Sequence, residues 1–336
     1  MKLIRGLFRL FFRLMEAVFV FLLAGVLTIF FWYMVSGRSQ GFPEVHSLQD
    51  LQLLIRTMAE SLNIPAVSQF FETVTPAQTV YQPSVTFDER FYPYYGLLDD
   101  DGKLVYAQLY ENAMNMRDSF FPAVSGLSTE KAEEIWMSVY EDHPELFWLE
   151  ESCSFTYLST GQVTEIHLSF NDLARNIDES RAKFDQSVSA VLSEASQYTS
   201  EQNKELAVHD ALARMIEYDE TTRYHQSAYS ALVDGRSVCA GYARAFQLIL
   251  TRAGIPCWYV TGWSGENHGW NIVELEGDLY DVDLTWDDTT NTHAFFNRTD
   301  EDLRATHIRR DLSVKLPECF GGKWNNTEPI PELVFD

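Results

Sequence analysis

The chain has 336 residues, 46% hydrophobic and 22% charged, with a formal net charge of −24 at pH 7. This length corresponds to about two domains, and the composition excludes a disordered chain, a collagen and a small disulfide-stabilised protein. Five of the 25 basic residues lie in the first 38 positions, against one of the 49 acidic residues. The rest of the chain is strongly acidic, so it repels phosphate backbones and is not expected to bind nucleic acid.

Residues 14–35 are predicted to form a transmembrane helix. They read LMEAVFVFLLAGVLTIFFWYMV, an apolar run that spans about 33 Å as a helix. A cleaved signal peptide is the alternative, but its apolar core is shorter, and Trp32 and Tyr33 favour a bilayer interface. Because the basic segment 1–13 precedes the span, the positive-inside rule places it in the cytoplasm. We expect a single-pass protein of the cell membrane, bound to the lipid bilayer through residues 14–35, with its acidic body outside the cytoplasm.

The next part of the chain changes from a linker to a mixed helix and strand pattern. Residues 36–90 contain a short helical pattern and a polar stretch with Pro76 and Pro83, which predict a stalk or linker. Residues 91–175 predict an accessory α+β region. Its expected elements are helices over 104–121 and 128–142 and a hairpin of strands 153–158 and 163–170 around Thr160-Gly161.

Two amphipathic helices, over 175–198 and 200–218, are expected to lead into the segment that carries chemistry. There, residues 240–253 have helical spacing, which places Cys239 at a helix N-terminus. The unpaired amide groups and the positive end of the helix dipole favour a thiolate at that position. The alternative is that Cys239 is a small core residue, since free cysteine is often buried.

Strands are expected over 257–262, 268–275 and 279–286, with a hairpin turn at 276–278. Period-two alternation in LYDVDLTW predicts that Asp281, Asp283 and Thr285 share a polar face. A histidine on one strand and an aspartate on the next can complete a nucleophile, base and orienting carboxylate set with Cys239. Alone, His268 is more often a polar packing residue, but the three residue types together indicate catalysis.

Four segments, VCAGYARAFQLIL, GIPCWYVTG, HGWNIVEL and LYDVDLTWDD, resemble in order and spacing the Cys, His and Asp motifs of the transglutaminase-like superfamily, a branch of the papain-like cysteine fold. The match looks like the bacterial membrane-anchored members and covers about residues 205–288. The resemblance implies an α+β transglutaminase-like catalytic domain over 176–336, in which Cys239 is the nucleophile, His268 the base and Asp283 the orienting residue. It implies no metal and no organic cofactor. It leaves the reaction open, because the superfamily includes cross-linking acyltransferases, proteases, amidases and members that have lost catalysis.

Three aromatic residues, Tyr229, Trp270 and Trp286, are candidates for lining the acyl site or for donating a hydrogen bond to an oxyanion. Core packing is the favoured role for Trp286. The backbone N–H of Cys239 is another candidate oxyanion donor.

The remaining polar motifs predict no metal site. The acidic run 281–288 lacks the glycine and glutamate of an EF-hand loop, and we interpret its carboxylates as hairpin and turn acids. The four cysteines contain no CxxC pair, which argues against zinc. His293 and His307 have no assigned partner and are expected to be surface or structural residues.

We therefore expect an envelope-anchored enzyme with an extracytoplasmic catalytic domain acting on protein, peptide or cell-wall substrates. Cys239 would attack a glutaminyl or peptide amide, with hydrolysis favoured over transfer to an amine. The alternative is a catalytically silent surface module that binds peptide or cell-wall polymer in the same groove.

Overall fold

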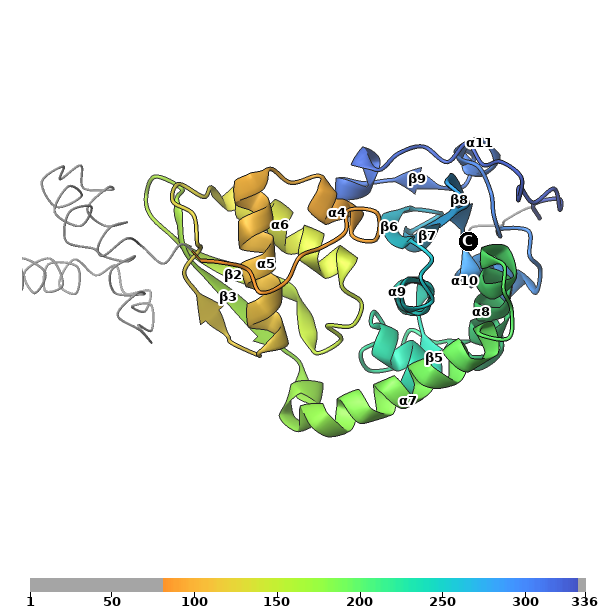
Figure 1. Cartoon of the computed structure of the whole chain (residues 1–336), viewed down its shortest axis with the longest axis horizontal. Coiled ribbons are helices and arrows are strands. Elements are labelled where there is room, and N and C mark those ends of the chain that lie inside the picture. The colour runs from red at the N-terminus through yellow and green to blue at the C-terminus, as the bar shows by residue number, and fades with distance from the viewer. Residues whose placement is uncertain (1–80, 332–336) are drawn as a thin grey trace, which may run out of the picture. The chain divides into compact units, whose positions relative to one another are not determined.

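The computed structural model describes residues 81–331 (Figure 1). The predicted basic segment 1–13, the predicted transmembrane helix 14–35 and most of the predicted stalk lie outside this range. Among the helices within 81–331, none is both long enough and apolar enough to cross a membrane. The described residues combine helices with two antiparallel sheets and one short parallel pair of strands, which confirms the predicted α+β class.

The accessory region packs two helices against a three-stranded antiparallel sheet of order β1-β3-β2. Ser128 caps the N-terminus of α6, because its side chain accepts a hydrogen bond from Lys131 N–H. The predicted first helix is shorter than expected: it ends at Met114, and the chain reaches Met116 with a positive φ before it joins the sheet. The elements are α5 (Asp100–Met114), β1 (Ser119–Phe120), α6 (Thr129–Asp142), β2 (Leu149–Tyr157) and β3 (Val163–Phe170).

The last residues of the predicted stalk lie against this region instead of forming a free linker. The Tyr81 hydroxyl donates a hydrogen bond of 2.7 Å to the Glu111 carboxylate on α5. The Phe87 ring packs edge-on against the rings of Tyr106 and Tyr110, with centroids 5.1 and 5.2 Å away. Aromatic packing therefore joins residues 81–90 to the accessory helices.

The predicted catalytic domain is built around helix α9 (Cys239–Arg252) and a four-stranded sheet of order β8-β7-β6-β9. Strands β6, β7 and β8 form consecutive antiparallel pairs, and β9 pairs with the far edge of β6. Helices α7 (Ile177–Ala195) and α8 (Glu201–Met215) confirm the two predicted amphipathic helices and cover α9 from the other side (Figure 1). The strands are β6 (Cys257–Trp263), β7 (Asn267–Leu275), β8 (Asp278–Val282) and β9 (Ile308–Arg309).

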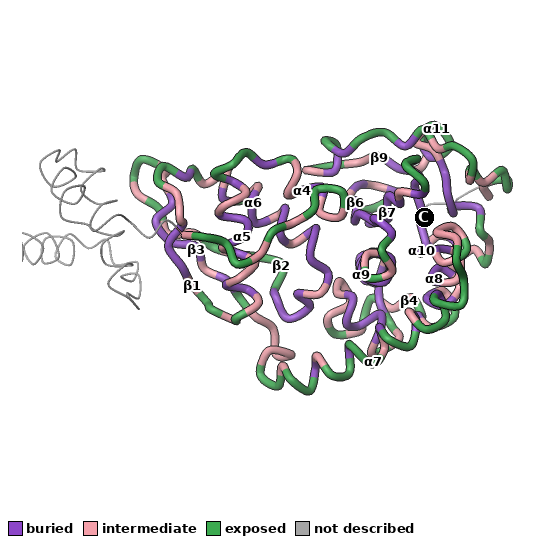
Figure 2. Tube along the Cα trace, viewed as in Figure 1, coloured by how far each residue is buried: buried purple, intermediate pink, exposed green. Residues whose placement is uncertain are grey.

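Helix α9 is the most buried helix of the predicted catalytic domain: every residue from Ala240 to Leu250 is buried, and it lies inside the ring of surrounding elements in Figure 2. Most of its apolar side chains belong to a hydrophobic cluster that also contains Trp148 of the accessory region and Phe184 of α7. One continuous core therefore supports both the accessory and the catalytic segments.

The predicted strand over 279–286 is wrong beyond Val282. Strand β8 ends there, and Asp283 caps the N-terminus of helix α10 (Leu284–Thr290) by accepting a hydrogen bond from Trp286 N–H. Alternating burial is also absent, because residues 280–283 are all buried. Aspartate is a strong N-cap residue, and here the cap overrides the alternating pattern.

Short elements complete the described chain. They are α4 (Pro93–Gly96), a 3-10 helix (Asp172–Asn176), β4 (Glu217–Tyr218), a π-helical turn (Ser230–Asp234), β5 (Arg236–Ser237), α11 (Asp300–Leu303) and a 3-10 helix (Asp311–Lys315).

Candidate active site

Cys239 is the first residue of α9, and its side chain is half-buried. The preceding loop packs tightly on this first turn: the Ser237 hydroxyl donates to the His225 carbonyl oxygen and lies 3.0 Å from the Ser230 hydroxyl. Gly241 permits this approach, because a Cβ there would lie 1.8 Å from the Ser237 oxygen. The thiol is therefore held at a helix N-terminus by a loop that tolerates no side chain at position 241.

His268 lies on β7 opposite Gly262 of β6, and its Nε2 is 2.6 Å from Asp283 Oδ2. Burial of the imidazole disfavours its charged form, but the Asp283 carboxylate and the Cys239 side chain outweigh burial and raise the pKa of His268 to about 10. These neighbours favour the charged form of His268. An imidazolium beside a cysteine stabilises the thiolate form of that cysteine.

Asp283 is fully buried and accepts three hydrogen bonds. Its Oδ1 accepts from Trp286 N–H at 3.0 Å, and its Oδ2 contacts His268 and a second imidazole, His307 Nε2, at 2.9 Å. Burial favours the neutral acid, but the two imidazoles outweigh burial and hold the pKa of Asp283 well below its usual range. The carboxylate is therefore charged and fixed in orientation.

His307 is the residue at this site that sequence reasoning missed. It is buried, and the strand that follows it, β9, pairs with β6 so that Arg309 lies opposite Gly262. This pairing delivers His307 to the end of β6 where His268 lies. A single histidine 24 residues beyond Asp283 has no periodic pattern, so no sequence signal marks this contact.

The three aromatic candidates occupy different places. Tyr229 packs its ring on Phe147 and Phe184 in the main core, with centroids 4.8 and 6.1 Å away, so the structure does not bring it to His268. Trp270 is buried, lies parallel to the His268 ring at 6.2 Å and donates its indole N–H to Asp281. An indole N–H that is already donated is not available to an oxyanion.

Trp286 is half-buried beside the site, with its ring centroid 6.0 Å from that of His268. Its indole N–H donates to the Ser264 hydroxyl at 3.2 Å. Trp286 therefore adjoins the imidazole and fastens the loop between β6 and β7.

The interpretation of the acidic run as hairpin and turn acids holds only for Asp281, which lies on strand β8 of the β7–β8 hairpin; the later carboxylates belong to α10, which corrects the rest. Asp283 caps α10, and Asp287 and Asp288 lie inside this helix. Asp287 accepts hydrogen bonds from the His209 imidazole and the Phe295 N–H, and Asp288 accepts one from Tyr242. These carboxylates therefore bind α10 to its neighbours.

Away from Cys239, two groups of the described residues bring together donor atoms of the kind that metals bind: Asp281, Asp300 and Cys319, and His209, Asp210 and His293. Nitrogen atoms of His209 and His293 and a carboxylate oxygen of Asp210 lie within 4.8 Å of one another. The buried His209 also contacts Asp287 through its other ring nitrogen, at 3.0 Å. In this structure the three side chains hydrogen bond to one another.

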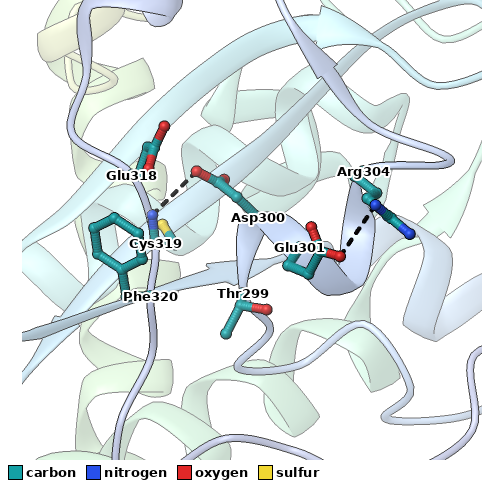
Figure 3. A pocket seen from close by; sticks show the side chains of 7 residues that line it. All are labelled: Thr299, Asp300, Glu301, Arg304, Glu318, Cys319 and Phe320. Carbon is teal, nitrogen blue, oxygen red and sulfur yellow. Dashed lines mark hydrogen bonds and ion pairs between the residues drawn. The ribbon is translucent and has the colours of Figure 1, made fainter.

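A pocket of about 390 Å³ lies between α11 and residues 318–320 (Figure 3). Inside it, Asp300 accepts a hydrogen bond from the Cys319 backbone N–H at 3.1 Å. None of its lining residues is Cys239, His268 or Asp283. The lining residues are Thr299, Asp300, Glu301, Arg304, Glu318, Cys319 and Phe320. The pocket is therefore separate from the candidate active site.

All four cysteines lie in the described range, and none of them forms a disulfide. Cys153 is half-buried, and burial together with Glu133 raises its pKa to about 12. Cys257 and Cys319 are buried. Cys257 lies in strand β6 and Cys319 lines the pocket. Neither thiol is therefore at a helix N-terminus, as the thiol of Cys239 is.

Comparison with known proteins places these residues in a family context. Residues 186–295 match the sequence model of the transglutaminase-like superfamily, and this range includes Cys239, His268 and Asp283. None of the curated proteins matches the chain by sequence. Among solved structures, the chain is similar to one described as a TGase, with 16% identity, coverage of 47% of this chain and 48% of the other, and a TM-score of 0.29.

A second similar structure is a cysteine-protease candidate from Cytophaga hutchinsonii, with 17% identity, coverage of 40% of this chain and 61% of the other, and a TM-score of 0.27. The chain thus spans less than two thirds of the length of either protein. The family match rests on the sequence, and it includes both the helix that begins at Cys239 and the strands that carry His268 and lead to Asp283. Residues 186–295 therefore form a domain of the transglutaminase-like superfamily.

Proposed function

We propose that this protein is a cysteine enzyme that forms a thioester between Cys239 and the acyl group of a peptide or glutaminyl amide. The observation that carries the proposal is the buried 2.6 Å contact between His268 and Asp283, beside a cysteine that begins a helix. A charged imidazole stabilises a thiolate nucleophile and can later give its proton to a leaving amine. The fold thus supplies the groups for both halves of acyl transfer.

In the first half, the Cys239 sulfur attacks the amide carbonyl carbon, and the carbonyl oxygen takes up the negative charge. The Cys239 backbone N–H is unpaired within the helix and is the candidate donor to this oxyanion. When the carbonyl re-forms, the C–N bond breaks and the amine leaves with a proton from His268. In the second half, water or an amine gives a proton to His268, attacks the thioester and releases Cys239.

For the acceptor, we infer hydrolysis over amine transfer. Transfer needs a site that delivers an amine while water is excluded. The loop between β6 and β7 is only a short turn, and Glu266 and Asn267 at its end are exposed. This open edge beside His268 supports access for water.

For the location, the basic segment 1–13 and the apolar segment 14–35 support a single-pass anchor with the catalytic domain outside the cytoplasm. The substrates would then be extracytoplasmic peptides, proteins or cell-wall polymers. No cofactor is needed for the steps described, because the nucleophile, base and orienting carboxylate all come from the chain.

The test of the acceptor uses the full chain with a glutaminyl peptide and a fluorescent primary amine, while released ammonia is measured. Ammonia release without amine incorporation is expected, and the Cys239→Ala variant should give neither product. Incorporation that keeps pace with ammonia release would show that transfer, not hydrolysis, is the reaction.

A second measurement separates an enzyme from a silent binding module. Iodoacetamide at about pH 6 should label Cys239 quickly, whereas a thiol with an ordinary pKa is only about 0.3% ionised there. Cys153 is a matched internal control, since it is also half-buried and burial raises its pKa to about 12. Equal slow labelling of both residues would contradict a catalytic Cys239.

A further inference from the structure

Two imidazoles share one oxygen of Asp283. Nε2 of His268 lies 2.6 Å from Oδ2, and Nε2 of His307 lies 2.9 Å from the same atom. The two rings are 5.8 Å apart and steeply inclined, at 67°. A carboxylate oxygen has two lone pairs, so it can accept both N–H groups at once.

The surroundings of His307 favour a proton on Nε2. Its Nδ1 lies 2.8 Å from the Thr306 hydroxyl. The same hydroxyl donates to the Leu303 carbonyl oxygen at 3.1 Å, so Thr306 bridges this carbonyl and the ring. A charged carboxylate can only accept hydrogen bonds, so the contact of 2.9 Å with Asp283 Oδ2 places an N–H on Nε2 of His307.

The His307 ring is also held by packing. Its side chain is 2% exposed, and its ring centroid lies 5.0 Å from that of Trp270, with the two rings nearly perpendicular, and 6.1 Å from that of Phe295. Trp270 is itself fixed by its hydrogen bond to Asp281. Asp283 and His268 are the titratable side chains that face His307 from α10 and β7. The geometry therefore leaves this imidazole one polar target besides Thr306, which is the orienting carboxylate.

We propose that His307 is a positioning residue whose N–H holds the Asp283 carboxylate in place and reduces its attraction for the proton on His268. This inference rests on the proposed function, in which His268 must give that proton to the leaving amine. A hydrogen bond donated to a carboxylate stabilises its charge and lowers its basicity. An outer partner of this kind tunes the group that performs the chemistry without touching the substrate.

Without His307, Asp283 would bind the charged form of His268 more strongly, and the imidazolium would be a weaker acid. We expect kcat of His307→Leu to fall about fivefold with KM unchanged. Only part of the free energy of the hydrogen bond between His307 and the charged carboxylate would act on His268. His307→Gln keeps an N–H donor and should restore most of the activity. His167→Leu is the matched control, because His167 is partly exposed on the accessory strand β3 and contacts Thr156 instead.

A second readout needs no turnover. In a Cys239→Ala background of the full chain, NMR titration of the His268 ring should show its pKa raised by about half a unit by His307→Leu. His307→Gln and His167→Leu should leave that pKa unchanged, and a His268→Gln variant assigns the signal.

The outcomes separate the two proposals. A raised pKa of His268 without any amide cleavage would sustain the positioning role of His307 and overturn the proposed reaction. An unchanged or lowered pKa in His307→Leu would overturn the positioning role whatever the activity. Equal losses in His307→Leu and His307→Gln, with normal melting of both, would also overturn it, because packing and not the N–H would then be what matters.

Discussion

The guanidinium of Arg244 donates a hydrogen bond of 2.6 Å to the backbone carbonyl oxygen of Tyr140. The same cation lies over the rings of Tyr140 and Tyr259 and 3.4 Å from the Glu141 carboxylate. A buried cation on α9 therefore ties this helix to α6 of the accessory region. Because Cys239 begins α9, the accessory region helps to hold the thiol in position.

Arg244→Met should destabilise the protein strongly. It leaves the Glu141 carboxyl buried without its cation. Burial raises the pKa of this carboxyl to about 7, and Arg244 acts against that rise. Removing one partner of a buried pair typically costs about 3–5 kcal/mol, which urea unfolding would measure. The control Arg252→Met removes an exposed pair with Asp185 and should cost about 0–1 kcal/mol. Equal stability of the two variants would contradict the role assigned to Arg244.

Asp283→Asn should reduce turnover by about 10⁴-fold, as the same change does in a comparable serine triad. It should also lower stability, because an amide can face either the two imidazoles or the Trp286 N–H with its oxygen, but not both. Peptide hydrolysis and thermal melting measure the two effects. Asp288→Asn on the same helix, where the carboxylate accepts from Tyr242, is the control and should retain turnover. Full activity of Asp283→Asn would mean that another group orients His268.

The His268–Asp283 pair should make stability depend on pH in a defined window. The pKa of His268 is raised from 6.5 to about 10 in the folded state. Its contribution to the free energy of unfolding is therefore complete below pH 6.5 and is lost as the pH rises towards 10. Since the pKa of Asp283 is lowered from 3.8, its contribution is present above pH 3.8 and is lost on further acidification. The difference in unfolding free energy between wild type and Asp283→Asn should therefore shrink from about pH 6 to about pH 10. A difference that grows over this range would contradict the assignment.

Gly241→Ala should disturb the surroundings of Cys239. The new Cβ would lie 1.8 Å from the Ser237 oxygen and 2.9 Å from the carbonyl oxygens of His225 and Ser227, so the loop before α9 must move. We expect a lower melting temperature and slower labelling of Cys239 by iodoacetamide. Gly96→Ala is the control, because the atoms nearest to its Cβ would belong to the flexible Glu89 side chain, at 3.2 Å or more. Unchanged labelling in Gly241→Ala would show that the loop does not position the thiol.

Residues 39–336 should lie outside the cytoplasm. The basic residues before residue 14 and the acidic body after residue 35 motivate this topology through the positive-inside rule. Protease added to intact cells or protoplasts should digest the body. A cytoplasmic protein measured in the same samples serves as the control for a sealed membrane. Complete protection of the body while that membrane is sealed would reverse the orientation.

Local patterns predicted much of the fold. The spacing of apolar residues in α7 matches the buried positions Phe184, Val188 and Val191, and the turn at Thr160-Gly161 joins paired strands as expected. These features depend on residues that are near one another in the chain. The predicted secondary structure was wrong after Val282, where one aspartate N-cap outweighs a run of residues that alternates as a strand does.

At the candidate site, sequence order was enough to indicate which residues belong together, but not their full set of contacts. His268 meets Asp283 because β7 pairs with β8, a neighbouring hairpin that the pattern predicts. His307 arrives through the pairing of β9 with β6, and a two-residue strand leaves no periodic signal. The placement of Tyr229 in the core likewise depends on distant partners, Phe147 and Phe184.

Asp283 both contacts His268 and caps the start of α10, so a single side chain links the proposed chemistry to the folding of the segment that follows it. Any substitution there changes two properties together, and an inactive protein made in this way would be a poor stand-in for the native one. A trap intended to capture a natural substrate is better built as Cys239→Ala. That change removes the sulfur from a half-buried position and leaves the cap, the sheet and both imidazoles on Asp283 unaltered. Substrates recovered on this variant would be bound by a surface nearly the same as that of the unsubstituted protein.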